Sequence, residues 1–90
     1  MINFETVLSD VKEEIWRQDT KWGANRLQDP FLWNTILMEE VGEYSMATLH
    51  TEFGGKESGN SYKEIVQVIA VGMQIANDLL IRDKVKVEKT

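Results

Sequence analysis

The segment Glu39-Glu40-Val41-Gly42-Glu43 decides how this chain of 90 residues is interpreted. It lies within residues 30–50, whose pattern predicts a single long helix. The apolar face of this helix consists of Leu32, Ile36, Met46 and Ala47. Glu39, Glu40 and Glu43 fall within the same arc at spacings of one, three and four residues. Three carboxylates are therefore expected on a face that should be buried.

Carboxylates in such a position need a cationic partner. Moving an ionised carboxylate into apolar surroundings is prohibitive without one, and neighbouring carboxylates raise one another's pKa. Mg²⁺ and Mn²⁺ prefer oxygen ligands of this kind. The segment therefore predicts a metal site. The alternative is a rotated helix whose acidic side is solvated, which would also expose Leu32, Ile36 and Met46.

Two more helices are expected around this one. The first is capped by Asn3, ends near Asp19 and carries a one-sided stripe of Phe4, Val7, Leu8, Val11 and Ile15. Trp16 falls off that stripe and should face a second surface. The third helix opens at Ser61 and is apolar on almost every side as far as Ile81. A helix of that kind is buried on every side, which in so short a chain requires a second copy.

The connections and the end of the chain complete the predicted fold. Residues 20–28 form a polar connection, and Asp29-Pro30 is a cap followed by proline, which starts the second helix. Residues 51–60 contain three glycines and form a loop, and residues 82–90 are expected to be frayed or to serve in a subunit contact. The prediction is one all-α domain, residues 1–90, with three helices in an antiparallel bundle completed by homo-oligomerisation.

Composition limits the classes of partner. The net charge of −5 and the pI near 4.8 argue against binding a nucleic-acid backbone, although bound metal ions would still permit nucleotides. No signal peptide or apolar run of ~20 residues is evident, so a cytoplasmic protein with no membrane partner is expected. A chain this short buries only roughly 60–65% of its unfolded surface, and it has no cysteine for disulfides. Self-association is the expected supplement.

Glu64 is the candidate for the second half of the metal site. It lies on the third helix, which must pack against the second, and it is flanked by apolar residues. Glu40, Glu43 and Glu64 could converge on one or two ions, and two metals ~3.5–4 Å apart stabilise both oxygens of a phosphoryl displacement. The alternative for Glu64 is a capping box with Ser61. Asp78 lies about 16 Å beyond Gln67 along the axis, too far to share an ion.

These motifs resemble a known family. Glu39-Glu40-Val41-Gly42-Glu43, followed by Glu64-Ile65-Val66-Gln67, is similar to the paired EExxE and ExxD motifs of the MazG-like all-α nucleoside triphosphate pyrophosphatases. The segment Arg17-Gln18-Asp19-Thr20-Lys21-Trp22-Gly23 also looks like the short members of this group. The resemblance covers roughly residues 13–80. EExxE alone is common in helices, and the ordered pair of motifs is the more specific signal.

The resemblance implies Mg²⁺-dependent hydrolysis, with Mn²⁺ as an alternative ion, of a nucleoside triphosphate to the monophosphate and pyrophosphate. It implies helical homodimers or homotetramers that clear surplus or non-canonical nucleotides. Carried over by position, Glu40, Glu43 and Glu64 would bind metal, and Glu39 would be a further ligand or would orient the attacking water. Gln67 departs from the family's Asp. Its amide oxygen can bind a metal, but one negative charge is lost.

Four residues of the first helix are candidates for substrate binding: Arg17, Gln18, Lys21 and Trp22. Arg17 and Lys21 suit phosphate contacts, although charged residues at helix ends are commonly only solvated. Gln18 interrupts the apolar stripe and should make a specific hydrogen bond, and Trp22 is either a core or interface residue or a platform for the base. The competing hypothesis is a catalytically silent MazG-like interaction module, which the neutral Gln67 favours.

Overall fold

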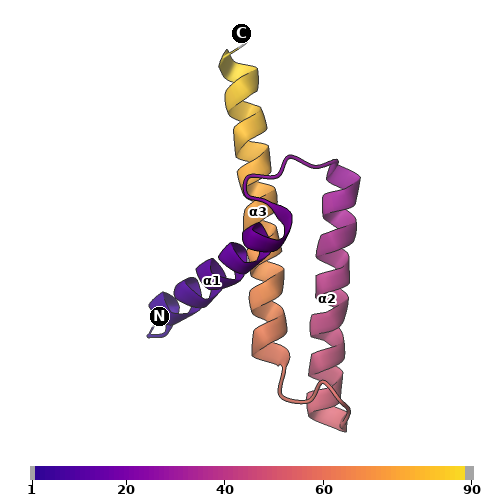
Figure 1. The fold of residues 1–90 in the computed structure, drawn as a ribbon. Coiled ribbons are helices and arrows are strands. Elements are labelled where there is room, and N and C mark those ends of the chain that lie inside the picture. The colour runs from indigo at the N-terminus through magenta and orange to yellow at the C-terminus, as the bar shows by residue number, and fades with distance from the viewer. Residues whose placement is uncertain (1, 89–90) are drawn as a thin grey trace.

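The computed structural model of the protein describes residues 2–88, with side chains placed for residues 2–86. It contains three helices, α1 (Phe4–Trp22), α2 (Pro30–Phe53) and α3 (Ser61–Glu88) (Figure 1). No strand occurs among residues 2–88. The prediction of an all-α chain with three helices is therefore confirmed.

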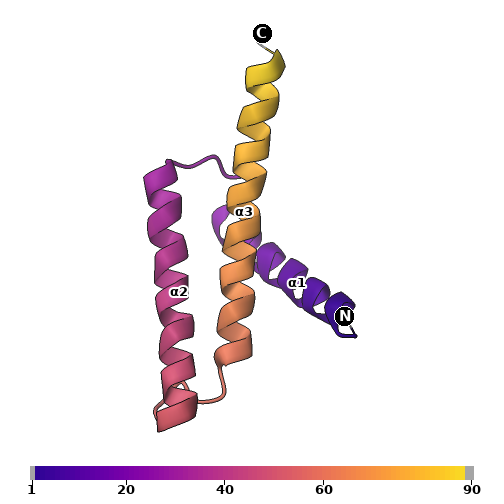
Figure 2. The same ribbon diagram turned by 180° about the vertical axis from the view of Figure 1, so that it is seen from behind.

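The helices are arranged around α3. Helices α2 and α3 run side by side in opposite directions, whereas α1 crosses α3 obliquely and points away from α2 (Figures 1 and 2). Helix α3 packs against both of the other helices, and α1 and α2 do not pack against each other. The arrangement is thus an antiparallel α2–α3 pair with α1 laid across it. It differs from the expected bundle in the direction of α1.

The predicted capping contact forms at the start of α2, but not at the starts of α1 and α3. The Asp29 carboxylate accepts a hydrogen bond of 2.7 Å from the backbone N–H of Phe31, and Pro30 occupies the first turn, as predicted. Asn3 stands at the cap position of α1, but its side chain makes no capping hydrogen bond. The predicted capping box of α3 does not form, because Ser61 is already helical and its hydroxyl lies 3.5 Å from that of Thr51.

The ends of α1 and α2 each lie three residues beyond their predicted positions. Both helices stop at a glycine with positive φ, Gly23 at 97° and Gly54 at 95°. The backbone N–H of each glycine donates back into the last turn at 2.7 Å, to the carbonyl oxygens of Asp19 and His50. The charged segment that was expected to fray continues α3 as far as Glu88. It contains neither glycine nor proline to stop the helix; residues 89–90 lie outside the described range.

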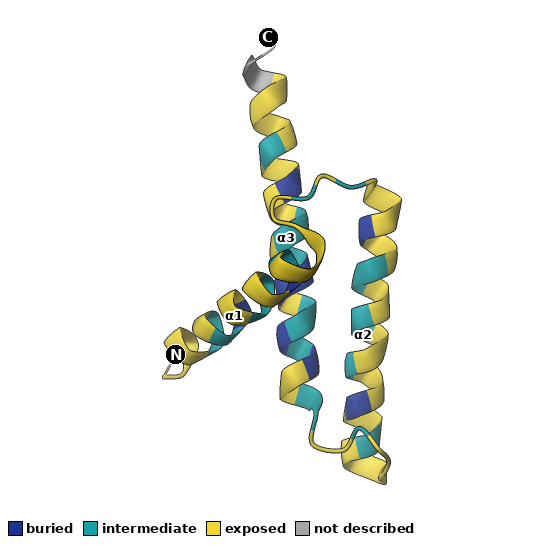
Figure 3. Ribbon diagram, in the orientation of Figure 1, coloured by how far each residue is buried: buried dark blue, intermediate teal, exposed yellow. Residues whose placement is uncertain are grey.

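The core lies along the two contacts made by α3. Its buried hydrophobic residues are Val11, Trp33, Ala47, Val66, Ala70 and Val71. Val11 of α1 packs with Val66 and Ala70, and Val7 and Ile15 flank it, as the predicted stripe of α1 requires, whereas Phe4 at the start of the stripe is exposed. Trp16 is off the stripe and 72% exposed. Figure 3 shows the buried segments on the sides of α1 and α2 that face α3.

Helix α3 is buried on one side only within a single chain, so the expectation of burial on every side is not met there. Its exposed apolar residues include Ile69, Met73, Leu79 and Leu80. The segment Ser61–Lys86 is long and apolar enough to cross a membrane, with a mean hydropathy of 1.4 over an 18-residue window. The core helix of a soluble protein meets the same criterion of length and composition.

Candidate functional site

Three carboxylates meet where α2 packs against α3. Glu40 and Glu43 lie one turn apart on α2, and Glu64 lies in the first turn of α3. One carboxylate oxygen from each residue lies within 4.8 Å of the others. Glu64 is 8% exposed, Glu40 is half-buried and Glu43 is exposed. The antiparallel packing thus brings together the three residues that the sequence predicted as metal ligands.

The electrostatics of this acidic cluster, defined as Glu40, Glu43 and Glu64, disfavour charge. Burial, followed by the charges of Glu43 and Glu64, raises the pKa of Glu40 to about 7. Burial and then Glu43 also raise the pKa of Glu64. No lysine or arginine among residues 2–86 forms an ion pair with any of the three. The three carboxylates therefore repel one another, and no ion pair with these residues neutralises them.

Gln67 lies beside two members of the acidic cluster. With its amide nitrogen turned toward them, it donates to Glu40 Oε2 at 3.1 Å and to Glu64 Oε2 at 2.9 Å. With the amide rotated by half a turn, its oxygen instead points toward the same two carboxylates. Gln67 therefore lies beside the acidic cluster and can donate hydrogen bonds to two of its carboxylates.

Glu39 stands apart from the acidic cluster. It is exposed and does not belong to the group whose oxygens converge. The expectation of three buried carboxylates on one apolar face of α2 was therefore wrong: Glu39 and Glu43 are exposed, as are Leu32 and Met46 of the predicted apolar face. The Glu39 side chain lines a cavity together with Glu40. The structure thus gives Glu39 a different position from that of the other three carboxylates, at the wall of this cavity.

This cavity has a volume of about 550 Å³ and lies between the end of α1, the α1–α2 connection and α2. Its lining residues are Arg17, Gln18, Lys21, Trp22, Arg26, Gln28, Leu32, Trp33, Ile36, Glu39, Glu40 and Val71. All four residues that the sequence predicted for substrate binding are therefore in one place with Glu39 and Glu40. The cations come from α1 and the connection, and the carboxylates come from α2.

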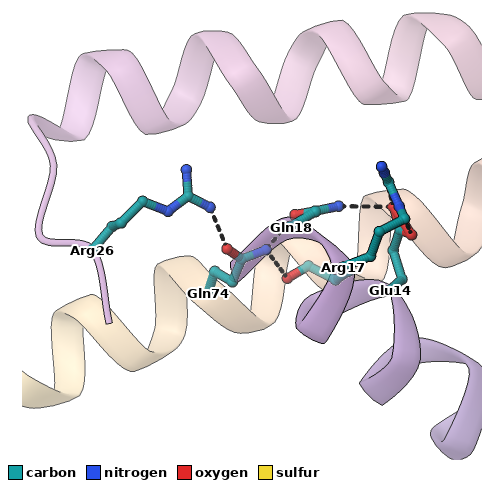
Figure 4. Close-up of polar contacts among 6 residues, drawn as sticks. Glu14, Arg17, Gln18, Arg26 and Gln74 are labelled. Atoms are coloured by element: carbon teal, nitrogen blue, oxygen red, sulfur yellow. Dashed lines mark hydrogen bonds and ion pairs between the residues drawn. The ribbon is translucent and has the colours of Figure 1, made fainter. Parts of the chain in front are cut away.

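A chain of hydrogen bonds connects two arginines of the cavity (Figure 4). Arg26 donates to Gln74 Oε1 at 2.5 Å, and Gln74 donates to Gln18 Oε1 at 2.5 Å. Gln18 donates in turn to Glu14 Oε1 at 3.1 Å, and both oxygens of Glu14 accept from Arg17 at 2.6 and 2.8 Å. Gln18 does make the specific hydrogen bonds expected of it, and its partners are protein side chains.

A second buried carboxylate fixes the α1–α2 connection. Asp78 of α3 is 1% exposed and accepts from the Trp33 indole at 2.7 Å and from the backbone N–H of Gln28 at 2.9 Å. It also forms an ion pair with Arg82, whose guanidinium donates to the Gln28 carbonyl oxygen at 3.0 Å. These contacts hold one wall of the cavity and do not involve the acidic cluster, in agreement with the predicted separation.

Four further residues of the cavity and its hydrogen-bond chain were not predicted: Glu14, Arg26, Gln28 and Gln74. Arg26 and Gln28 lie in an irregular connection, where no periodicity predicts the direction of a side chain. Comparison of the chain with protein-family models, with curated proteins and with solved structures finds no match.

Proposed function

We propose that the protein is a metal-dependent nucleoside triphosphate pyrophosphohydrolase of the MazG-like kind, which releases a nucleoside monophosphate and pyrophosphate. The observation that carries the proposal is the position of the acidic cluster. Its carboxylates converge, and Glu40 also lines a cavity that contains Arg17, Lys21 and Arg26. A site for cations thus adjoins a site for a polyanion, which is the combination that a triphosphate substrate requires.

Glu40, Glu43 and Glu64 would hold Mg²⁺ or Mn²⁺, and Gln67 would add its amide oxygen. The donor set fits, because all of these atoms are hard oxygen donors and the cluster has no cationic partner within residues 2–86. A bound divalent ion supplies neutralisation of phosphate charge and polarisation of the phosphorus–oxygen bonds. Binding of the ion would also lower the pKa of Glu40, because a nearby positive charge favours the ionised carboxylate.

The remaining residues would bind and orient the nucleotide. Lys21 and Arg17 would contact the polyphosphate, and Trp22 with Leu32 offers an apolar surface for the base. Glu39 would orient the attacking water and accept its proton. The water oxygen bonds to the α-phosphorus, the bond from that phosphorus to the α–β bridging oxygen breaks, and pyrophosphate leaves.

Self-association belongs to this proposal. Apolar residues on α2 and α3 remain exposed in the single chain, and they include Met38, Leu49, Ile69 and Met73. Covering them in a homodimer or homotetramer would remove apolar surface from water. The enzyme would act in the cytoplasm on surplus or non-canonical nucleotides, with no nucleic-acid or membrane partner.

One observation favours a second candidate, a catalytically silent helical interaction module. The Gln67 amide can donate to Glu40 and Glu64 at the same time, so part of the acidic cluster is satisfied without a metal. An Asp at this position would instead add a fourth carboxylate. A silent module would keep the fold and show no rise in melting temperature with Mg²⁺ or Mn²⁺.

The test is pyrophosphate release from a panel of canonical and modified nucleoside triphosphates, with Mg²⁺, with Mn²⁺ and with EDTA. We expect metal-dependent release that falls at least about a hundredfold in Glu43→Gln, with helical content unchanged. Glu52→Gln is the matched control, because Glu52 is an exposed glutamate of the same helix. Absence of release by a folded protein across the panel, without any metal-induced stabilisation, would establish the silent module instead.

A further inference from the structure

Arg26 differs from the other two arginines of the chain in its partners. Arg17 is paired with Glu14, and Arg82 is paired with Asp78. Arg26 forms no ion pair with any residue from 2 to 86, and its hydrogen-bond partner is the neutral amide of Gln74. Its Nε atom is buried and has no acceptor among these residues. A partly buried guanidinium is thus left without a counter-charge.

The Arg26 side chain is nevertheless held in place. Its guanidinium carbon lies 5.4 Å from the centroid of the Trp33 ring, and Trp33 is itself anchored by its indole hydrogen bond to Asp78. Gln74 fixes the guanidinium from the other direction through the hydrogen-bond chain that ends at Arg17 (Figure 4). The arginine is therefore oriented before any ligand binds, which lowers the entropic cost of binding.

The cavity around Arg26 contains two further features that suit an anion. Lys21 stacks over the Trp22 ring at 4.9 Å and has no acidic partner among residues 2–86. The Gln28 amide nitrogen, like Arg26 Nε, is buried without an acceptor. Both residues line the cavity with Arg26. Two unpaired cations and an unpaired amide donor match a ligand with several negatively charged oxygens.

We infer that Arg26 binds the polyphosphate of the nucleotide and orients it toward the carboxylates of α2. The identity of the ligand as a nucleotide rests on the proposed function, whereas the affinity of Arg26 for a polyphosphate does not. The planar guanidinium can donate to two phosphate oxygens at once, and its position over the Trp33 ring holds it in place for this contact. Arg26 is thus a substrate-binding residue supplied by the α1–α2 connection.

The experiment measures the binding of inorganic tripolyphosphate to the full chain by tryptophan fluorescence, in EDTA and near pH 6. Without metal, the result does not depend on whether the acidic cluster binds ions or turns over substrate. We expect Arg26→Gln to weaken binding about tenfold or more, which corresponds to the loss of one charge-assisted contact. Arg26→Lys retains the positive charge but not the planar pair of donors, so it should give an intermediate loss of tripolyphosphate affinity.

Two controls separate this inference from its alternatives. Lys56→Gln removes one positive charge from the exposed α2–α3 loop and should change binding less than twofold. Glu43→Gln should abolish pyrophosphate release and leave tripolyphosphate binding intact. Unchanged tripolyphosphate binding in folded Arg26→Gln would overturn the inference. It would also be overturned if Arg26→Gln weakened the binding of a nucleoside triphosphate but not of tripolyphosphate, since the contact would then be to base or sugar.

Discussion

Asp78 and Glu40 are both carboxylates within the α2–α3 pair, yet their surroundings are opposite. Asp78 accepts hydrogen bonds from the backbone of Gln28 and from Trp33. Its ion pair with Arg82 is the largest cause that lowers its pKa to about 2. Glu40 is surrounded by other carboxylates, and burial followed by those charges raises its pKa to about 7. The difference separates a carboxylate whose charge the fold stabilises from one whose charge the fold disfavours.

The comparison also explains why the acidic cluster is a better functional candidate than Asp78. The Asp78 carboxylate already accepts hydrogen bonds from Gln28 and Trp33 and forms an ion pair with Arg82. A metal cation could bind there only by breaking these contacts. Among residues 2–86, the side chain that donates hydrogen bonds to the acidic cluster is Gln67, and its amide can rotate. A cation would therefore relieve repulsion at the cluster, and it would displace stabilising contacts at Asp78.

The largest effect that tests this comparison is expected from Asp78→Asn. The change removes the counter-charge of Arg82 and places an amide where three donors converge, so we expect a loss of about 3 kcal/mol in the free energy of unfolding. Urea denaturation followed by circular dichroism measures it. Asp83→Asn is the control, because Asp83 is an exposed residue of the same helix and should be nearly neutral. Equal stability of Asp78→Asn and Asp83→Asn would remove the structural role assigned to Asp78.

Gln67→Asp tests whether the neutral side chain of Gln67 limits the affinity of the acidic cluster for a divalent ion. The substitution replaces the donor to Glu40 and Glu64 with a fourth carboxylate, which should tighten Mn²⁺ binding roughly tenfold and lower the melting temperature of the metal-free protein. Titration calorimetry and a thermal melt in EDTA measure the two effects. Gln67→Leu removes the amide without adding charge and should weaken Mn²⁺ binding instead. Identical Mn²⁺ affinities in both variants would exclude Gln67 from the site.

The smallest effect is a dependence of stability on pH, with opposite signs at the two sites. The folded-state pKa of Glu40, about 7, lies above its ordinary value of 4.5. Its contribution to stability is therefore fully present below pH 4.5 and is lost as the pH rises through 7. The folded-state pKa of Asp78, about 2, lies below its ordinary value of 3.8. Its contribution is present above pH 3.8 and is lost as the pH falls through 2.

Thermal melts of the metal-free protein should therefore show a loss of a few degrees between pH 5 and pH 8. Glu40→Gln should abolish most of this loss, because an amide does not titrate, and saturating Mn²⁺ should do the same. A melting temperature that is independent of pH from 5 to 8 in EDTA would show that the acidic cluster carries no such repulsion.

Local sequence signals predicted the helices well because each signal acts through nearby backbone atoms. Asp29-Pro30 starts α2 as expected, and the stripe on α1 faces the core. The predicted ends of α1 and α2 were short because the stop is made by a glycine with positive φ, whose hydrogen bond back into the last turn the apolar pattern does not show. The end of α3 was missed because alternating charge resembles a frayed tail although nothing in it terminates a helix.

The metal-ligand candidates were predictable because two of them share one helix face, where the spacing alone brings them together. That Glu64 completes the group was expected from the need of α3 to pack against α2, and the structure places its carboxylate with the others. The position of Glu39 was less well predicted. A residue next to Glu40 in sequence is rotated by about 100° around the helix, and only the packing of α2 shows which side faces α3.

The sequence by itself determined that the chain is helical and where its helices begin, because these properties depend on residues within a few turns of one another. The tertiary structure decided the oblique direction of α1, the cavity between α1 and α2, and the contrast between Asp78 and Glu40. It also brought Arg26 into that cavity with Gln74 as its neutral partner. These features depend on contacts between residues about 50 positions apart, such as Arg26 with Gln74 and Trp33 with Asp78, whose pairing no local pattern specifies.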